Sequence, residues 1–258
     1  MKRYITKIVL ILTVLCVGIY SCKQLDDTRP FDKFDETAVW SSKGNAMLFV
    51  NGVYSSVLGL YTNTVEEEVR TSNIIQSDGN AFTRESITRD DDYGFNQFSR
   101  IRSCNLIIEK AAASTALGDG DKAELVAHGK FLRAMTYYWL ARRFGRVIWV
   151  EKVLTENETN YALPQTANIA ETYNLIMKDI DDAIAGLPAS SPAGLASKAS
   201  AYALKSEAAL QAAAYTGDNT YYQKAIDAAN AVIATGKPLE ADYEGMFNEK
   251  ARFSPEIL

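Results

Sequence analysis

The sequence predicts an all-α fold, organised as a tetratricopeptide-like stack of helix pairs with long irregular loops. Two observations lead to this prediction. From about residue 43 onward, apolar side chains recur at steps of three and four residues, the spacing of one face of an α-helix. The chain also contains two alanine-rich helical segments joined by a short turn, and alanine faces let helix axes approach closely. The strict repeat consensus is not met, so any antiparallel α-hairpin remains an alternative for this pair.

The helical pattern can be followed through the first half of the domain. Five apolar residues predict one face of a first helix, namely Ala46, Phe49, Val50, Val53 and Val57. Residues 61–95 lose this period and predict a mostly irregular segment, which in a compact domain is more often functional than a filler. The helical period returns over residues 97–113 and 121–144, and Gly145 is a natural stop for the second of these helices. The following "VIWV" predicts a short extended piece.

A capped helix is predicted next. Asn168 is suited to the N-cap, Glu171 three residues later completes a variant of the capping box, and Pro188 closes the helix. The inward face consists of Ile169, Tyr173, Ile176, Ile180, Ile184 and Leu187. The acidic residues of this helix, Asp179, Asp181 and Asp182, are expected to be solvated.

The alanine-rich pair follows over residues 197–215 and 219–236, joined around "TGDN". In the second of these helices, four residues share one face and predict the contact with the first, namely Ala225, Ala228, Ala229 and Val232.

The first 21 residues have the pattern of an export signal. Lys2, Arg3 and Lys7 accompany an apolar run that is shorter than the about 20 residues of a membrane-spanning helix. Residues 19–22, Ile-Tyr-Ser-Cys, resemble the lipobox of a bacterial lipoprotein, in which the cysteine is obligatory. An uncleaved anchor, or an ordinary signal with an incidental cysteine, remains the alternative.

Cys22 is therefore predicted to be the first mature residue and the site of lipidation. Its thiol can form a thioether with a lipid donor, and the amino group freed by cleavage can take a further acyl chain. Two or more chains give a durable membrane anchor, whereas one holds a protein only marginally. Residues 22–42 are polar, contain Pro30 and suit a lipid-anchored tether, which leaves 43–258 as the helical domain.

Composition excludes several classes of function. Removing residues 1–21 leaves 24 Lys and Arg residues against 32 Asp and Glu, a formal charge of −8. Such an acidic protein is a poor partner for nucleic acid, whose binding depends on basic side chains. Besides Cys22, only Cys104 would remain, so no internal disulfide is possible, and a chain of this length must be held by its core. Cys104 is expected to be a buried helix residue.

The residue set also argues against catalysis. His128 is the only histidine, so neither a zinc site nor a metal cluster can be assembled, and its helical context favours a structural role over a catalytic triad. Carboxylates cluster in "RDDDYGF" and "KDIDDAI", but they are adjacent rather than set on facing walls as a glycosidase requires. We therefore expect no enzyme, no metal and no cofactor.

The stretch "GKFLRAMTYYWLARRFGRVIWV" is similar to the signature of the SusD/RagB family, in which "FLRA", aromatic residues and "RRFG" lead into a short hydrophobic strand. Three more stretches agree in order: "SRIRSCNLIIEK", "SKASAYALKSEAALQAA" and "YYQKAIDAANAVIATGKPLEADYEGMF". The resemblance covers about residues 43–258. Trp139 and Trp149 depart from the usual pattern, and a tryptophan at such a place is more often core than ligand platform.

The resemblance implies a lipoprotein of the outer membrane of Bacteroidetes that faces outward. Such a protein captures a glycan and acts as a lid on a TonB-dependent, SusC-like transporter. A peptide or other nutrient is the alternative ligand. Asp26 and Asp27 loosely resemble the acidic tag that sends such lipoproteins to the surface. Family chains are usually much longer, so the chain is expected to be the N-terminal part of such a protein, with part of the binding surface outside it.

The candidate ligand residues lie in the irregular segment. Sugars are held by aromatic faces and a few polar groups, and the loop 78–95 provides both. Phe82, Tyr93 and Phe95 are the predicted ring faces, and Asn80 and Arg84 the predicted hydrogen-bond donors.

Overall fold

The computed structural model describes residues 36–62, 94–155, 162–247 and 254. The chain divides into two compact units, 1–39 and 40–258. The first is described only through the short helix α2 (Glu36–Val39), so the predicted signal and Cys22 lie outside the described residues. Everything below concerns the second unit. Within the described ranges, no helix combines the length and the apolar character needed to cross a membrane.

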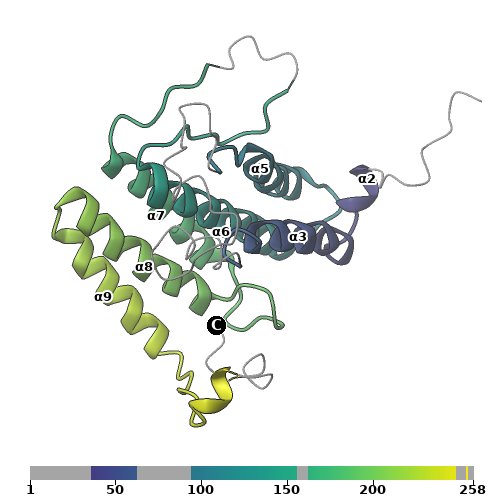
Figure 1. Cartoon of the computed structure of the whole chain (residues 1–258). Coiled ribbons are helices and arrows are strands. Elements are labelled where there is room, and N and C mark those ends of the chain that lie inside the picture. Colours follow the sequence, from purple (N-terminus) through teal and green to yellow (C-terminus); the bar gives the residue numbers. More distant parts are fainter. Residues whose placement is uncertain (1–35, 63–93, 156–161, 248–253, 255–258) are drawn as a thin grey trace, which may run out of the picture. The chain divides into compact units, whose positions relative to one another are not determined.

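The second unit is an all-α stack in its described part (Figure 1), which confirms the predicted fold class. Each helix packs against the next along the series α5, α6, α7, α8 and α9, and α3 covers α5 and α6. A single 3₁₀ turn, Glu244–Phe247, follows the last helix. The helices are α3 (Lys43–Leu58), α5 (Phe98–Ala113), α6 (Asp119–Phe144), α7 (Ile169–Gly186), α8 (Lys198–Thr216) and α9 (Thr220–Ile233).

The predicted ends of the helices are confirmed by their caps. The Asn168 side chain accepts a hydrogen bond from the backbone N–H of Glu171 at 2.8 Å, and the Glu171 carboxylate accepts one from the N–H of Ala167. Gly145 ends α6 with a φ of 72°, a left-handed conformation that favours glycine. The predicted extended piece is present as an isolated antiparallel bridge between Ile148 and Gln165.

Small residues bring the helices close together. A Cβ on Gly186 of α7 would lie 2.7 Å from the Ala123 carbonyl oxygen of α6, so only glycine fits this contact. Between α8 and α9, Ala209 is fully buried, and Ala225 and Ala228 are buried as predicted, while Ala229 is only half-buried.

Cys104 and His128 both lie in the core; burial was predicted for Cys104, and a structural role, in the core or at the surface, for His128. Cys104 is buried, and burial raises the pKa of its thiol to about 12, so the thiol stays neutral and unreactive. His128 is buried, and its Nδ1 lies 2.7 Å from the hydroxyl of Tyr54 on α3.

One prediction about α7 is wrong. Asp181 and Asp182 are exposed as expected, but Asp179 is only 2% exposed. Its carboxylate is taken out of water because Arg133 of α6 reaches it with two nitrogen atoms. A buried charge needs such a partner. Arg133, an arginine in the middle of an apolar helix, was a sequence signal for this buried ion pair that the sequence interpretation did not use.

Candidate ligand-binding site

Most of the predicted ligand residues lie outside the described residues: Asn80, Phe82, Arg84 and Tyr93. Phe95 is described and is half-buried. Its ring meets Phe98 edge-on at 6.1 Å between centroids, and Phe144 at 5.2 Å. Phe95 therefore ties the C-terminal end of the predicted ligand loop to α5 and α6, and the role of all five residues in ligand binding stays a prediction.

The described residues on either side of positions 63–93 meet at one side chain, Trp139 of α6. On one side, the indole N–H of Trp139 donates a hydrogen bond to the Leu60 carbonyl at 3.0 Å. On the other side, the indole packs against Gly94, where a Cβ would lie only 2.5 Å from the ring carbon Cη2. Gly94 also has a φ of +88°, so both its conformation and its surroundings favour glycine.

Further contacts fix both stems. The Tyr61 hydroxyl donates to the Met135 carbonyl of α6 at 2.7 Å. The Gln97 amide donates to the Gly94 carbonyl at 2.7 Å, and Arg100 links Gln97 to the Ser56 carbonyl of α3. These residues, together with Trp139, form what we call the loop base: Leu60, Tyr61, Gly94, Gln97, Arg100 and Trp139.

Arg143 covers the loop base from the side of α6. Its guanidinium carbon lies 3.8 Å from the centroid of the Trp139 ring, within the range of a cation–π contact. Burial disfavours the charged guanidinium and lowers the pKa of Arg143 below its ordinary value, although the group remains protonated at neutral pH. The sequence correctly indicated that Trp139 lies in the core and that Gly145 ends α6. Nothing in the sequence showed that Trp139 contacts both stems.

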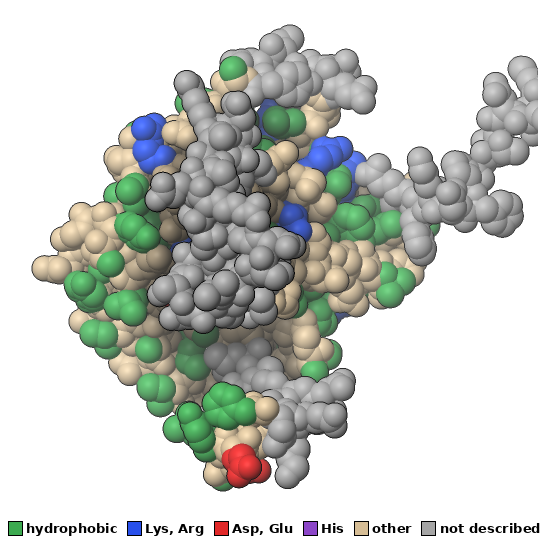
Figure 2. Space-filling view, in the orientation of Figure 1, with side chains coloured by type: hydrophobic (Ala, Val, Ile, Leu, Met, Phe, Trp, Pro, Cys, Tyr) green, Lys and Arg blue, Asp and Glu red, His purple; other side chains and the backbone are tan. Residues whose placement is uncertain are grey.

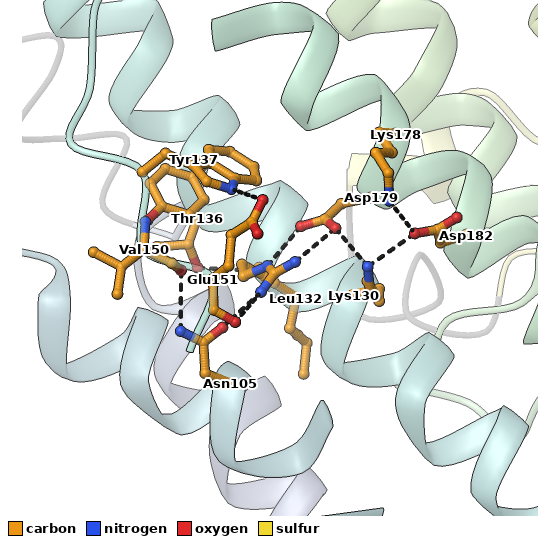
Figure 3. A network of polar contacts seen from close by, with 12 residues as sticks. Asn105, Lys130, Leu132, Thr136, Tyr137, Val150, Glu151, Lys178, Asp179 and Asp182 are labelled. Carbon is orange, nitrogen blue, oxygen red and sulfur yellow. Dashed lines mark hydrogen bonds and ion pairs between the residues drawn. The ribbon is translucent and has the colours of Figure 1, made fainter. Parts of the chain in front are cut away.

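A second polar cluster surrounds Arg133 on the same helix (Figure 3). The Arg133 guanidinium donates to both carboxylate oxygens of Asp179, at 2.6 and 2.8 Å, and to Asn105 Oδ1 of α5 at 2.8 Å. Lys130 adds a contact to Asp179 at 3.1 Å and one to Asp182 at 2.8 Å. Burial disfavours the charged form of Arg133, but the hydrogen bonds that Arg133 donates to the Asp179 carboxylate and the charge of that carboxylate outweigh this effect, so the pKa of Arg133 is raised.

This cluster holds the segment Val147–Leu154, which we call the strap. The Asn105 amide donates to the carbonyls of Val150 and Lys152, both at 3.0 Å. Arg133 donates to the Glu151 carbonyl at 3.1 Å. The cluster therefore provides hydrogen-bond donors for the backbone carbonyls of a non-helical segment.

Two aromatic rings complete the attachment of the strap. The Tyr137 hydroxyl accepts from the Val150 N–H at 2.7 Å and donates to the Ile148 carbonyl at 3.2 Å. The Trp149 ring stacks on Tyr137 with 4.0 Å between centroids. Trp149 is half-buried, and its indole N–H donates to Glu151 at 3.1 Å. The "FLRA" and aromatic parts of the signature therefore serve the scaffold.

An apolar pocket of about 270 Å³ lies between α5 and the strap. Phe98 provides its one aromatic ring, and Arg102 and Lys152 are its charged members. Arg102 already donates to the Leu154 carbonyl at 3.1 Å. The mostly aliphatic lining suits an apolar group better than a sugar ring, and the sequence interpretation did not foresee this pocket. The lining consists of Phe98, Ile101, Arg102, Ile148, Val150, Lys152, Leu154 and Leu163.

The described residues contain no group of three or more His, Cys, Asp or Glu side chains that could hold a metal ion. The two polar clusters described above attach the strap and the loop base to α5 and α6. The fold and these contacts define a class of protein, namely a helical scaffold that holds two non-helical parts of the chain, the strap and the loop base.

The chain belongs to the SusD-like family described as "Starch-binding associating with outer membrane", whose model matches residues 30–210. It is 28% identical over 149 residues to the starch-binding protein SusD of Bacteroides thetaiotaomicron, covering 57% of this chain and 25% of that protein. The family resemblance predicted from the four sequence stretches is thereby confirmed.

Solved structures of the family share the fold. A SusD-like protein from Bacteroides fragilis matches with a TM-score of 0.70 and 26% identity, over 88% of this chain and 46% of that one. A SusD superfamily protein from Parabacteroides distasonis matches with a TM-score of 0.64 and 23% identity, over 78% of this chain and 48% of that one. The chain thus spans less than half the length of these relatives.

Proposed function

We propose that this protein captures oligosaccharides at the cell surface and passes them to a TonB-dependent, SusC-like transporter in the outer membrane. In this proposal Cys22 carries the lipid that holds the protein in the outer membrane, facing outward. The protein binds its ligand and does not convert it. Phe82, Tyr93 and Phe95 offer ring faces to sugar, and Asn80 and Arg84 donate hydrogen bonds to hydroxyl groups.

The observation that carries the proposal is the family match over residues 30–210, whose description names starch binding and the outer membrane. The 28% identity to a starch-binding protein supports the same class of ligand. The loop base adds a structural reason to look at the segment between its stems. Trp139 contacts Leu60 and Gly94, so the described stems on both sides of residues 63–93 start from one place on the helical stack. Binding residues are often carried on segments that a rigid scaffold positions in this way.

A peptide or other nutrient is the second candidate ligand. The apolar pocket beside the strap favours it, because an aliphatic lining of about 270 Å³ could take a side chain but offers few partners for hydroxyl groups. Glycan binding would depend on the predicted loop, whereas peptide binding through this pocket would depend on Ile101 and Leu163.

Calorimetry on the full-length protein tests the proposal. A panel of polysaccharides, starch included, and of mixed peptides is titrated first. For a bound polysaccharide, Phe82→Ala and Tyr93→Ala should each weaken binding by about 1–3 kcal/mol, by analogy with aromatic stacking on nucleobases. Tyr243→Ala is the matched control, because Tyr243 is 74% exposed outside the loop.

The proposal fails if no polysaccharide binds, or if both loop variants bind like the wild type. Binding of peptides alone, reduced by Leu163→Ala, would establish the second candidate instead.

Anchoring is tested separately by cell fractionation. Cys22→Ser should move the protein from the membrane pellet to the soluble fraction, because the acyl chains have no other attachment point. A Cys22→Ser protein that still pellets after a salt wash would contradict lipid anchoring without affecting the proposal on ligands.

A further inference from the structure

Helices α6 and α8 meet along a line of polar and aromatic side chains. The Tyr138 hydroxyl of α6 donates a hydrogen bond to the Glu207 carboxylate of α8 at 2.9 Å. Arg142 Nη1 lies 3.9 Å from the same carboxylate, and the Tyr215 hydroxyl of α8 donates to the Arg142 carbonyl at 3.3 Å. Residues four apart share one side of a helix, so each helix turns a single stripe of such residues toward the other.

Helix α7 packs against both α6 and α8 and adds a third ring to this line (Figure 1). Tyr173 of α7 is fully buried, and its ring stacks on that of Tyr215 with 6.4 Å between centroids. Burial and the neighbouring Tyr215 raise the pKa of Tyr173, whereas the charge of Arg142 lowers it. The Tyr173 hydroxyl therefore stays protonated at neutral pH and lies within electrostatic range of both residues.

Two buried side-chain oxygens in the described part of the chain lack a hydrogen-bond partner, and both belong to this region. They are Tyr173 Oη and Oε1 of Gln211, which lies between Glu207 and Tyr215 on the same stripe of α8. Buried polar atoms are nearly always hydrogen-bonded, so these two call for an explanation. We call the whole set the tyrosine cluster: Tyr138, Arg142, Tyr173, Glu207, Gln211 and Tyr215.

Three members of the tyrosine cluster reach solvent. The side chains of Arg142 and Glu207 are 37% and 61% exposed, and Tyr215 is 49% exposed. The guanidinium can only donate hydrogen bonds, the carboxylate accepts them, and their charges cancel. The Tyr215 ring adds a flat apolar surface beside them. A donor, an acceptor and a ring with no net charge suit a neutral sugar, whose hydroxyl groups both donate and accept.

The tyrosine cluster adjoins the loop base along α6. Tyr61 of the loop base donates to the carbonyl of Met135, which lies three residues before Tyr138. Burial raises the pKa of Tyr61, and the charges of Arg142 and Glu207 act on it in opposite directions. Tyr61 therefore lies near the charged pair, and the cluster sits beside one of the two stems of the predicted ligand loop.

We propose that the tyrosine cluster is a second contact surface for the oligosaccharide and binds a neutral sugar unit. Tyr215 stacks on the sugar ring, Arg142 donates to one hydroxyl group, and Glu207 accepts from another. The Gln211 amide can turn toward the sugar because its oxygen gives up no hydrogen bond. The inference rests on the proposed function, since it extends the same glycan site from the predicted loop to the helical scaffold.

Calorimetry on the full-length protein tests the inference with oligosaccharides of defined length. The neutral probes are maltoheptaose, cellohexaose and laminarihexaose, and the acidic probe is an oligogalacturonate of similar length. A neutral probe should bind, and Tyr215→Ala should raise its Kd about five-fold or more, by analogy with the loss of one stacking ring from a nucleobase.

The outer part of the stack provides the matched control. Hydrophobic side chains over α8 and α9 are scattered rather than gathered into one patch (Figure 2). Tyr222 of α9 is 44% exposed, much like Tyr215, and lies on a helix that contributes nothing to the tyrosine cluster. Tyr222→Ala should therefore bind the same probe with the affinity of the wild type.

Hydroxyl-radical labelling of the wild-type protein gives a second readout that does not depend on the folding of a variant. At a saturating concentration of the neutral probe, labelling of Tyr215 should slow several-fold, because the bound sugar covers its ring. Labelling of Tyr222 should not change. If Tyr215→Ala does not fold, this measurement decides.

Either an unchanged Kd in Tyr215→Ala or an unprotected Tyr215 would overturn the inference. If Phe82→Ala and Tyr93→Ala still weaken binding in that case, the proposed function stands and only the second contact surface is lost. Binding of the acidic probe alone, or of peptides alone, would contradict a neutral sugar at the tyrosine cluster. Failure of every oligosaccharide to bind would remove the proposed function together with the inference.

Discussion

Helix α6 holds two non-helical parts of the chain by different physical means. Around Arg133 it attaches the strap through buried charges and hydrogen bonds to backbone carbonyls. Around Trp139 it attaches the two stems of the loop base through a flat ring, one indole hydrogen bond and a close contact with Gly94. The first attachment depends on the pairing of charges, and the second depends on shape.

The difference shows which attachment can tolerate change. Removing one member of a buried ion pair leaves a charge without a partner, which costs far more than the pair itself contributes. Removing part of a packed ring costs an amount that grows with the space left behind. We therefore expect the attachment of the strap to be lost completely when one charge is removed. The attachment of the loop base should instead weaken gradually as the packing around Trp139 is reduced. The predictions below test this contrast, from the largest effect to the smallest.

Arg133→Met should lower the free energy of unfolding by about 3–5 kcal/mol, because it strands the buried Asp179 carboxylate. Urea denaturation followed by circular dichroism measures it. The double variant Arg133→Met with Asp179→Leu should lose less than the single variant, since no charge is left unpaired. A loss below about 1 kcal/mol in the single variant, the range of an exposed pair, would show that the strap does not depend on this charge.

The helices could be predicted from the sequence, but the attachments of the strap and the loop base could not. Apolar periodicity and the Asn168 cap are local signals, and the structure agrees with both. Asp179 was predicted to be solvated because the pattern of its own helix shows an apolar face beside it and no partner for its charge. That partner, Arg133, is 46 residues away in the chain. Trp139 was correctly expected in the core, but its hydrogen bond to Leu60 spans 79 residues, and no local pattern encodes such a pairing. The ligand residues predicted from local patterns stay a prediction, because Asn80, Phe82, Arg84 and Tyr93 lie outside the described residues.

The second prediction concerns the buried, uncharged pair formed by His128 and Tyr54. His128 is buried between α3 and α6, with Glu124 and Lys43 as nearby charged groups, and burial lowers its pKa from 6.5 to about 4. The unfolded chain then binds more protons than the folded one between these pH values. Stability should be constant above about pH 6.5 and should fall by about 3 kcal/mol as the pH drops to 4.

Urea denaturation at a series of pH values measures this effect. His128 is the only histidine of the chain, so few other groups titrate between pH 5 and 6.5. His128→Gln should flatten the curve in that window while the wild type falls. An equal slope in both proteins would assign the acid sensitivity to carboxylates instead.

Gly94→Ala tests the loop base and should destabilise by about 1–3 kcal/mol, because the added Cβ would overlap the Trp139 ring. The positive φ of Gly94 adds strain for any other residue. Gly120→Ala is the matched control. Gly120 lies in the first turn of α6 with no atom within 4 Å of an added Cβ, so alanine there should be neutral or stabilising. Thermal unfolding of both variants decides, and equal melting temperatures would show that Trp139 can move away from Gly94.

The smallest effect is expected at the exposed edge of the Arg133 cluster. Lys178 lies one turn before Asp182 on α7, at 3.1 Å, and the two side chains are 66% and 43% exposed. Lys178→Ala should change the free energy of unfolding by no more than about 0.5 kcal/mol, since water and salt screen such a pair. Lys130 contacts the same Asp182 but is only 16% exposed and also reaches Asp179, so Lys130→Ala should cost more. Equal losses in the two variants, measured by urea denaturation at low and high salt, would mean that burial does not set the strength of these contacts.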